Sequence, residues 1–208
     1  MKVAALYVER GGPYFAMPDV DPWDKERDAR LYAGPLPVVA HPPCGPWGRL
    51  HHLYRGDEHD CAPTAIRAVQ KWGGVVEHPA YSRAWRLSQL PWPGEFADEH
   101  GGFTVAVDQV SWGHVARKAT WLYVVGVPLR EVLAGVRTGG TPTHWVAGFH
   151  QRGGGRAKYP QSGSAAPPGI KICSSQQRRR TPPAFARWLV DLAATARVDQ
   201  AELALGAG

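Results

Sequence analysis

One cysteine stands where a protein would present a side chain to a ligand. Cys44 follows the apolar run Leu36–Ala40 and the stiff sequence His41-Pro42-Pro43. The run predicts a buried strand, and ligands of doubly wound sheets bind at the carboxyl ends of strands. Because two prolines restrict the backbone there, we expect a thiol held in place for nucleophilic attack. The alternative is a core cysteine packed under the turn.

A carboxylate follows another short apolar run in the same way. Glu77 comes directly after Val75-Val76 and before His78-Pro79, so we expect it at the same edge of the sheet as Cys44. A half-buried glutamate with a raised pKa could donate a proton to a ring nitrogen. The alternative is a glutamate that caps the following turn.

Two cations precede the apolar run Trp121–Val127. Arg117 and Lys118 come shortly before this predicted strand, which we expect at the opposite side of the sheet. Such cations could hold a phosphate or the carbonyl oxygen of a base. The alternative is an ordinary basic loop.

The elements that must position these side chains alternate along the chain. Strands that alternate with helices or helix-length connections predict one α/β domain over residues 1–208, with a mostly parallel, Rossmann-like sheet reduced in size. A flexible Gly/Pro-rich insert is expected at about 137–169, and a C-terminal helix at about 183–197 with Thr181 as its N-cap. The other expected elements are strands at Val3–Val8, Leu36–Ala40, Val75-Val76, Phe103–Val107 and Trp121–Val127, and a helix at Ala62–Trp72.

Composition limits the class of protein. The chain has 208 residues, of which 44% are hydrophobic, and it contains three cysteines at uneven spacing. No apolar run approaches the roughly 20 residues that span a bilayer, so we expect a soluble cytoplasmic protein without a disulfide framework. From His150 onward nine basic residues face three acidic ones, which accounts for the whole net charge of +6. This asymmetry suits a polyanion such as DNA, or it is a solvated basic face.

Taken together, these motifs resemble the DNA cytosine-5 methyltransferases in a short, truncated form. The catalytic Pro-Cys loop of that family is matched by Pro43-Cys44, and its Glu-Asn-Val strand end resembles Glu77-His78-Pro79. The family's cofactor loop resembles Leu6–Gly12, and its acidic second strand end is similar to Asp19–Trp23. The segment Thr181–Leu192 resembles the helix that returns to pack beside the first strand.

The resemblance implies a mechanism for the candidate residues. Cys44 would add to C6 of cytosine and make C5 nucleophilic. Glu77 would bond to the ring N3, and Arg117 or Lys118 would hold the base carbonyl. The base would first be flipped out of the DNA duplex.

The resemblance also implies that S-adenosylmethionine is the cofactor, bound where the first two strands end. Glu9 stands in place of the first glycine of the family's loop, and only six residues separate Gly12 from Asp19. The helix that follows this loop in the family must therefore be missing or reduced to a turn. The residues expected to bind the cofactor are Tyr7, Gly11 and Gly12, with Asp19 or Asp21 on the ribose and Trp23 on the adenine.

Three other interpretations stay open. A metal site could use the cysteines and histidines at His41, Cys44, His51, His52, His59 and Cys61, because zinc favours such ligands. The chain could instead be a nucleic-acid-binding accessory protein that keeps a methyltransferase fold. Or the thiol could act on a pyrimidine with a donor other than methyl.

Overall fold

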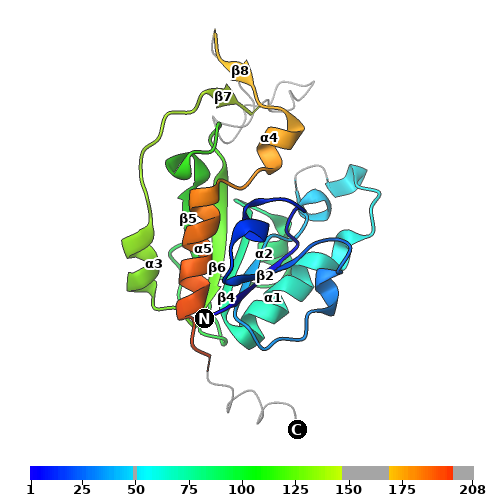
Figure 1. The fold of residues 1–208 in the computed structure, drawn as a ribbon, viewed down its shortest axis with the longest axis vertical. Helices are drawn as coiled ribbons and strands as arrows, with labels where there is room; N and C mark the ends of the chain where they lie inside the picture. The colour runs from blue at the N-terminus through cyan, green and yellow to red at the C-terminus, as the bar shows by residue number, and fades with distance from the viewer. Residues whose placement is uncertain (49–50, 147–168, 199–208) are drawn as a thin grey trace.

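A central sheet carries the fold (Figure 1). The computed structural model describes residues 1–48, 51–146 and 169–198. Within them, six strands lie side by side in the order β2-β1-β3-β4-β6-β5. Their bounds are β1 Val3–Leu6, β2 Val20–Trp23, β3 Val38–Ala40, β4 Gly74–Pro79, β5 Phe103–Asp108 and β6 Ala119–Val125.

The direction of the strands brings distant loops to one edge. Strands β2, β1, β3 and β4 run parallel to one another, whereas β6 is antiparallel to both β4 and β5. The expectation of a mostly parallel α/β sheet is confirmed. Because β6 runs the other way, Thr120 near its start pairs with Pro79 at the end of β4. The loop that precedes β6 therefore lies at the carboxyl edge of the parallel strands.

Helices cover both faces of the sheet (Figure 1). Helix α5 (Pro183–Thr195) packs across β1, β3 and β4 on one face. Helix α1 (Cys61–Trp72) packs against β3 and β4 on the other face, where α2 (Arg83–Leu87) adds the buried Trp85 to the same core. The short helix α3 (Leu129–Gly135) contacts α5.

Apolar periodicity explains both long helices. The buried positions of α1 recur every three or four residues, and α1 ends at Gly73, whose φ of 75° suits glycine. Helix α5 buries Phe185 and Leu189 completely, and each such side chain stabilises the fold by roughly 1.5–3 kcal/mol. The predicted N-cap was wrong. The cap is Pro182, without a side-chain hydrogen bond, so Thr181 stands one residue too early.

The segment after Gly12 is short, as expected. It forms a single 3-10 turn at Pro13–Ala16 instead of a helix. Most of the insert expected at 137–169 lies outside the described residues. Its described start contains β7 (His144–Trp145), which pairs in parallel with β8 (Lys171–Ile172) beyond the insert, and helix α4 (Ser175–Arg179) follows. No helix in the described part of the chain has the length and apolarity needed to cross a membrane.

Candidate active site

Cys44 lies at the carboxyl edge of the sheet with its side chain exposed. It follows β3 and caps the 3-10 turn Gly45–Trp47, whose backbone is fixed by hydrogen bonds from Trp47 N (3.1 Å) and Gly48 N (2.8 Å) to the Cys44 carbonyl oxygen. The alternative of a thiol packed in the core is wrong. The strand end and the proline turn present the sulfur to solvent.

Glu77 lies one strand away, at the same edge, and is buried. One carboxylate oxygen accepts a hydrogen bond from His41 Nδ1 at 2.8 Å, and the other accepts one from Gln109 Nε2, also at 2.8 Å. Gln109 is itself held by Thr120, whose Oγ1 accepts from the same amide nitrogen at 3.0 Å. Because both oxygens receive donors, these contacts stabilise the charged carboxylate.

The pKa of Glu77 is shifted in the opposite direction from the one that the sequence predicted. Burial alone would raise its pKa, but the positive charge of Lys118 and the hydrogen bond from His41 outweigh burial and lower the pKa from 4.5 to about 2. The expected raised pKa is therefore wrong. In the resting site Glu77 accepts hydrogen bonds, and it can donate one to a ring nitrogen only after it receives a proton.

A tyrosine completes this buried chain of hydrogen bonds. The Tyr14 hydroxyl lies 2.6 Å from His41 Nε2. Burial, with a smaller contribution from Glu77, holds the pKa of Tyr14 well above its usual value, so the hydroxyl keeps its proton and donates it to the ring. The ring of His41 then donates from Nδ1 to Glu77. Both ring nitrogens of His41 are thus engaged, and neither serves as a base for Cys44.

The other histidine of this region points away from the chain of hydrogen bonds. His78 follows Glu77 in β4, and successive side chains of a strand face opposite sides of the sheet. It is buried and packs against Trp85, with ring centroids 6.2 Å apart. Burial lowers the pKa of His78 to about 4, so the ring is neutral.

The thiol of Cys44 is protonated in the resting site. Although the side chain reaches solvent, the surrounding protein and the Glu77 carboxylate raise its pKa, and the positive charges of Lys118 and Arg179 oppose that shift. These two cations therefore favour the thiolate form of Cys44. Lys118 belongs to the candidate set from the sequence, whereas Arg179 comes from α4 near the C-terminus.

Arg117 has a different position from its neighbour Lys118. Its guanidinium Nη1 lies 3.3 Å from Asp108 Oδ2, at the end of β5, and the side chain is about half exposed. The backbone nitrogen of Lys118 also donates to Asp108, at 2.9 Å. The structure thus brings together Cys44, Glu77 and Lys118, and it leaves Arg117 at the outer side of this group.

The residues expected to hold a cofactor follow β1. Tyr7 adopts a φ of 59°, and its hydroxyl is buried without a hydrogen-bond partner among the described residues. Gly11 has a φ of 71°, which favours glycine. A Cβ on Gly12 would lie 2.8 Å from the carbonyl oxygen of Glu9, so this turn also requires glycine at that position.

Asp19 does not share this edge. It precedes β2 and therefore lies at the amino end of the strand, where its two oxygens accept hydrogen bonds from Arg187 of α5 at 2.9 and 2.8 Å. Asp19 therefore lies at the opposite end of β2 from the expected cofactor site, and the prediction that it binds the ribose is wrong. The contact instead ties α5 to the first two strands.

Asp21 and Trp23 lie in β2, where the sequence predicted contacts with a cofactor, but Arg27 already contacts both side chains. Trp23 Nε1 donates to Asp21 at 2.9 Å, and Arg27 pairs with the same carboxylate. The guanidinium carbon of Arg27 lies 3.8 Å from the centroid of the Trp23 ring. A ribose and adenine that bound here would have to displace Arg27. Exposed ion pairs of this kind contribute only about 0–1 kcal/mol.

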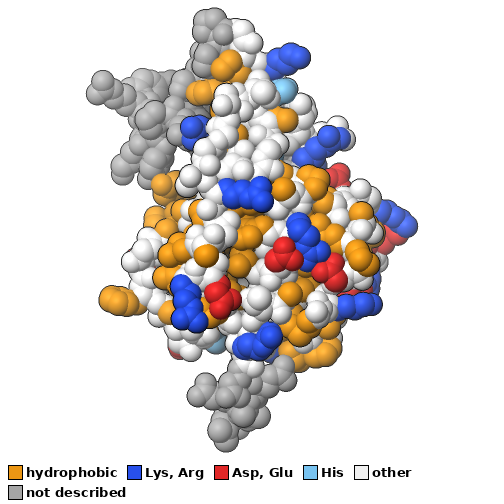
Figure 2. All heavy atoms as spheres, turned by 60° about the vertical axis from the view of Figure 1, so that its left-hand side comes forward, with side chains coloured by type: hydrophobic (Ala, Val, Ile, Leu, Met, Phe, Trp, Pro, Cys, Tyr) orange, Lys and Arg blue, Asp and Glu red, His pale blue; other side chains and the backbone are white. Residues whose placement is uncertain are grey.

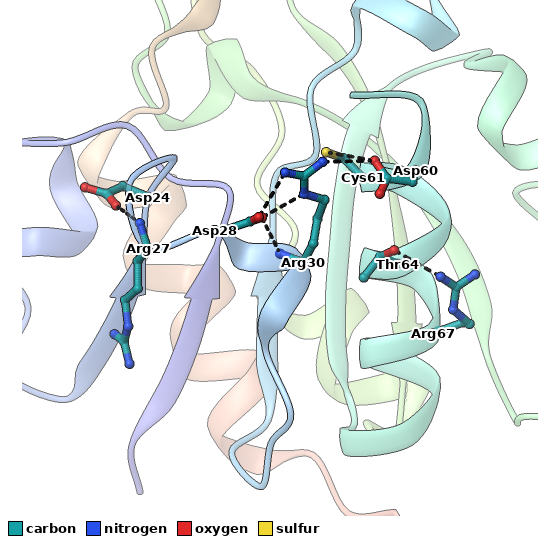
Figure 3. Close-up of polar contacts among 8 residues, drawn as sticks. All are labelled: Asp24, Arg27, Asp28, Arg30, Asp60, Cys61, Thr64 and Arg67. Carbon is teal, nitrogen blue, oxygen red and sulfur yellow. Dashed lines mark hydrogen bonds and ion pairs between the residues drawn. The ribbon is translucent and has the colours of Figure 1, made fainter. Parts of the chain in front are cut away.

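The second cysteine of the region belongs to a separate network (Figure 3). Arg30 bridges Asp28 and Asp60, and the Cys61 thiol donates to Asp60 at 3.9 Å. Burial and Asp60 raise the pKa of Cys61 to about 11, so this thiol is inert at neutral pH. Among the residues that the structure describes, no three His, Cys, Asp or Glu side chains are grouped so that they could hold a metal ion.

Several residues of the site carried no signal in the sequence. The sequence indicates His41 only as a possible metal ligand, and it suggests no role for Tyr14, Gln109 or Thr120. Gln109 and Thr120 lie on opposite sides of the loop that joins β5 to β6, so they meet only because those strands are paired. Tyr14 lies in the 3-10 turn after β1, and from there its hydroxyl reaches His41, which follows β3.

Comparison with known proteins adds no family to this description. No protein-family model matches the chain, and no curated protein shows significant similarity to it. The function must therefore be argued from the geometry of the carboxyl edge.

Proposed function

We propose that this protein modifies a pyrimidine base of DNA, with Cys44 as the covalent nucleophile and a cytosine C5 as the methylated atom. One observation carries the proposal: an exposed thiol at the end of β3 lies in the field of a buried, ionised Glu77 and of the cation Lys118. A nucleophile, a carboxylate and a cation at one sheet edge are the groups that addition to a pyrimidine ring requires.

The attack would begin with loss of the Cys44 proton to solvent. The sulfur adds to C6, and the C5–C6 electrons move through C4 to N3, which takes a proton from Glu77. Glu77 would take this proton from solvent when the base binds, and Lys118 would stabilise the negative charge that N3 shares with the C2 carbonyl oxygen. After C5 has gained its new substituent, the C5 proton leaves to water, its electrons restore the C5–C6 double bond and expel the sulfur, N3 returns its proton to Glu77, and the thiolate takes a proton from solvent.

His41, Tyr14 and Gln109 would position Glu77 for this role. Their hydrogen bonds fix both carboxylate oxygens, so the carboxylate is held in one orientation before the base arrives. Such preorganisation is a main source of electrostatic stabilisation in enzymes.

S-adenosylmethionine would supply an electrophilic methyl group. The residues present at the ends of β1 and β2 fit it in part. Gly11 and Gly12 allow a close approach of the ligand, and the Tyr7 hydroxyl is a buried group without a hydrogen-bond partner among the described residues. Asp21 and Trp23 would hold the ribose and the adenine once Arg27 has moved.

A second candidate keeps the same attack and changes the donor. The position of Arg27 over Trp23 and against Asp21 favours it, because these groups are engaged within the chain itself. In this version Cys44 acts on the same ring, and the substituent at C5 is larger than methyl or differently charged.

Mass spectrometry of nucleosides tests both versions. DNA would be isolated from cells that express the wild-type chain or Cys44→Ala, digested and separated. We expect 5-methyl-2′-deoxycytidine from wild-type cells and none above background from the variant. A different mass added to the pyrimidine would select the second donor. Unmodified pyrimidines in both samples would contradict the proposed function.

A further inference from the structure

We propose that helix α4 and the cations around it bind the phosphate backbone of a DNA strand and hold it over Cys44. This surface, called the arginine helix surface below, is defined by Lys118, Lys171, Arg178, Arg179 and Arg180. The proposal deepens the proposed function, since it names how the substrate strand is held, and binding can be measured without catalysis.

The chain leading to α4 is attached to the loop before β6. Backbone nitrogens of Thr143 and His144 donate to the Val115 carbonyl oxygen, both at 2.9 Å. Strand β8 pairs with β7, and Cys173 N donates to the Trp145 carbonyl oxygen at 2.8 Å. These contacts fix α4 above the carboxyl edge of the sheet, at the upper end of the molecule in Figure 1.

Gln177 anchors α4 itself. Its side chain accepts from Ser174 N at 2.8 Å, and its own backbone N donates to Ser174 Oγ at 3.1 Å, which forms a capping box. His114 Nε2 donates to the Gln177 carbonyl oxygen at 3.1 Å, and Gln177 Nε2 donates to His144 Nε2 at 3.3 Å. The helix is thus held from the core side, and its arginines are left to face outward.

Within the described part of the chain, the arginines at the end of this helix lack acidic partners. Arg178, Arg179 and Arg180 are exposed, and within the described residues none of them forms an ion pair with an acidic side chain, in contrast to Arg27 and Arg187. On the face drawn in Figure 2, acidic side chains lie on the body of the molecule, whereas its upper end shows Lys and Arg. Adjacent cations without counter-charges repel one another, and a polyanion removes that cost.

Two cations of the arginine helix surface lie near the thiol of Cys44. Arg179 from α4 and Lys118 from the loop before β6 both lie close enough to Cys44 to oppose the rise of its pKa. A strand whose phosphates lie along the arginine helix surface would therefore place a nucleotide at the nucleophile. Three consecutive exposed arginines carry more positive charge than one isolated anion would neutralise.

The test is the salt dependence of DNA binding. Fluorescence anisotropy with a labelled cytosine-containing oligonucleotide would be measured on the full-length Cys44→Ser protein, so that no covalent step contributes. Three variants of that protein would be compared: Arg178→Gln/Arg179→Gln/Arg180→Gln, the conservative triple change of the same residues to Lys, and Arg67→Gln/Arg86→Gln/Arg130→Gln. The last set removes three exposed arginines from α1, α2 and α3 and serves as the matched control.

Each phosphate contact adds about 0.9 to the slope of log K against log salt. We expect the first triple variant to lose about two to three units of slope, the Lys variant to keep the slope, and the control to match the parent. Equal slopes for the first variant and the control would overturn the proposal. Complete displacement of the oligonucleotide by an equimolar amount of 2′-deoxycytidine monophosphate would overturn it too, because the surface would then be a mononucleotide site. Binding that behaves as expected while DNA stays unmodified would refute only the proposed function.

Discussion

The buried carboxylate of Glu77 decides what chemistry the carboxyl edge can support. Its two oxygens are engaged by His41 and Gln109, and Lys118 keeps it ionised. Burial raises the pKa of Cys44 in the resting protein, and the negative charge of Glu77 adds to that effect. If the proposed function holds, transfer of a proton from solvent to Glu77 when a base binds would remove this repulsion.

The low pKa of Glu77 predicts a contribution to stability that depends on pH. A carboxylate with a pKa of about 2 in the fold and 4.5 unfolded stabilises the protein above pH 4.5 and loses that effect as the pH falls toward 2. The free energy involved is on the order of 3 kcal/mol. Urea unfolding at several pH values should show a steeper loss for wild type than for Glu77→Gln. Parallel curves for the two proteins would contradict the assigned ionisation.

Removal of the Tyr14 hydroxyl tests the chain of hydrogen bonds from the other end. Tyr14→Phe leaves His41 Nε2 without its donor at a buried position, which should lower the free energy of unfolding by about 1–3 kcal/mol. It should also shift the pH profile of DNA modification, because the orientation of Glu77 depends on His41. A variant with wild-type stability and pH profile would show that this contact contributes nothing.

Among the elements, α5 stabilises the sheet that positions the site. It packs across β1, β3 and β4, and Leu189 is completely buried within it. Leu189→Ala should lower the free energy of unfolding by about 2–5 kcal/mol. Leu133→Ala is the matched control, because Leu133 in α3 is 53% exposed, and it should change stability by less than about 1 kcal/mol. Similar losses in the two variants would mean that α5 is not the central covering helix.

A cofactor that bound near the turn after β1 and the end of β2 would have to compete with Arg27 for contacts with Asp21 and Trp23. Since Arg27 is bound to Asp21 and covers Trp23, S-adenosylmethionine should bind weakly to wild type. Arg27→Ala should bind it more tightly, by up to about fivefold if displacing the pair costs up to 1 kcal/mol. Asp21→Asn should weaken binding in either background. Calorimetry with S-adenosylmethionine and S-adenosylhomocysteine would measure this. No heat with either ligand at millimolar concentration, in any variant and with DNA present, would rule out methyl transfer.

For the molecule as a whole, local patterns were enough to predict most strands of the main sheet and the two long helices, but not the short helices, the small second sheet or the partners of each element. Apolar runs and glycine stops predicted β3, α1 and α5, and the two strand ends placed Cys44 and Glu77 at one edge, as the structure shows. The antiparallel course of β6 was not predictable from its own residues. Because β6 runs antiparallel to β4, the loop that contains Lys118 lies at the carboxyl edge of the sheet, near Cys44, and not at the amino edge.

The contacts that tune the site are long-range, and for that reason the sequence could not predict them. Glu77 and Gln109 are 32 positions apart, and their contact depends on pairing of β5 with β6. Arg179 comes near Cys44 because contacts with His114, Val115 and His144 attach α4 and the chain before it to the loop that precedes β6. The sequence pattern predicted Glu77 as a half-buried acid, because burial could be read from the strand but the charges around it could not.

Trapping a covalent bond between Cys44 and a base would test the proposed role of Cys44 most directly. DNA that carries 5-fluoro-2′-deoxycytidine would be incubated with the full-length protein and S-adenosylmethionine, because fluorine cannot leave C5 as a proton does and the adduct would persist. Mass spectrometry of the digested protein should then find the nucleotide attached to the peptide that contains Cys44, and no adduct in Cys44→Ala. Modification of ordinary DNA by the Cys44→Ala protein, or an adduct at another residue, would contradict the central claim.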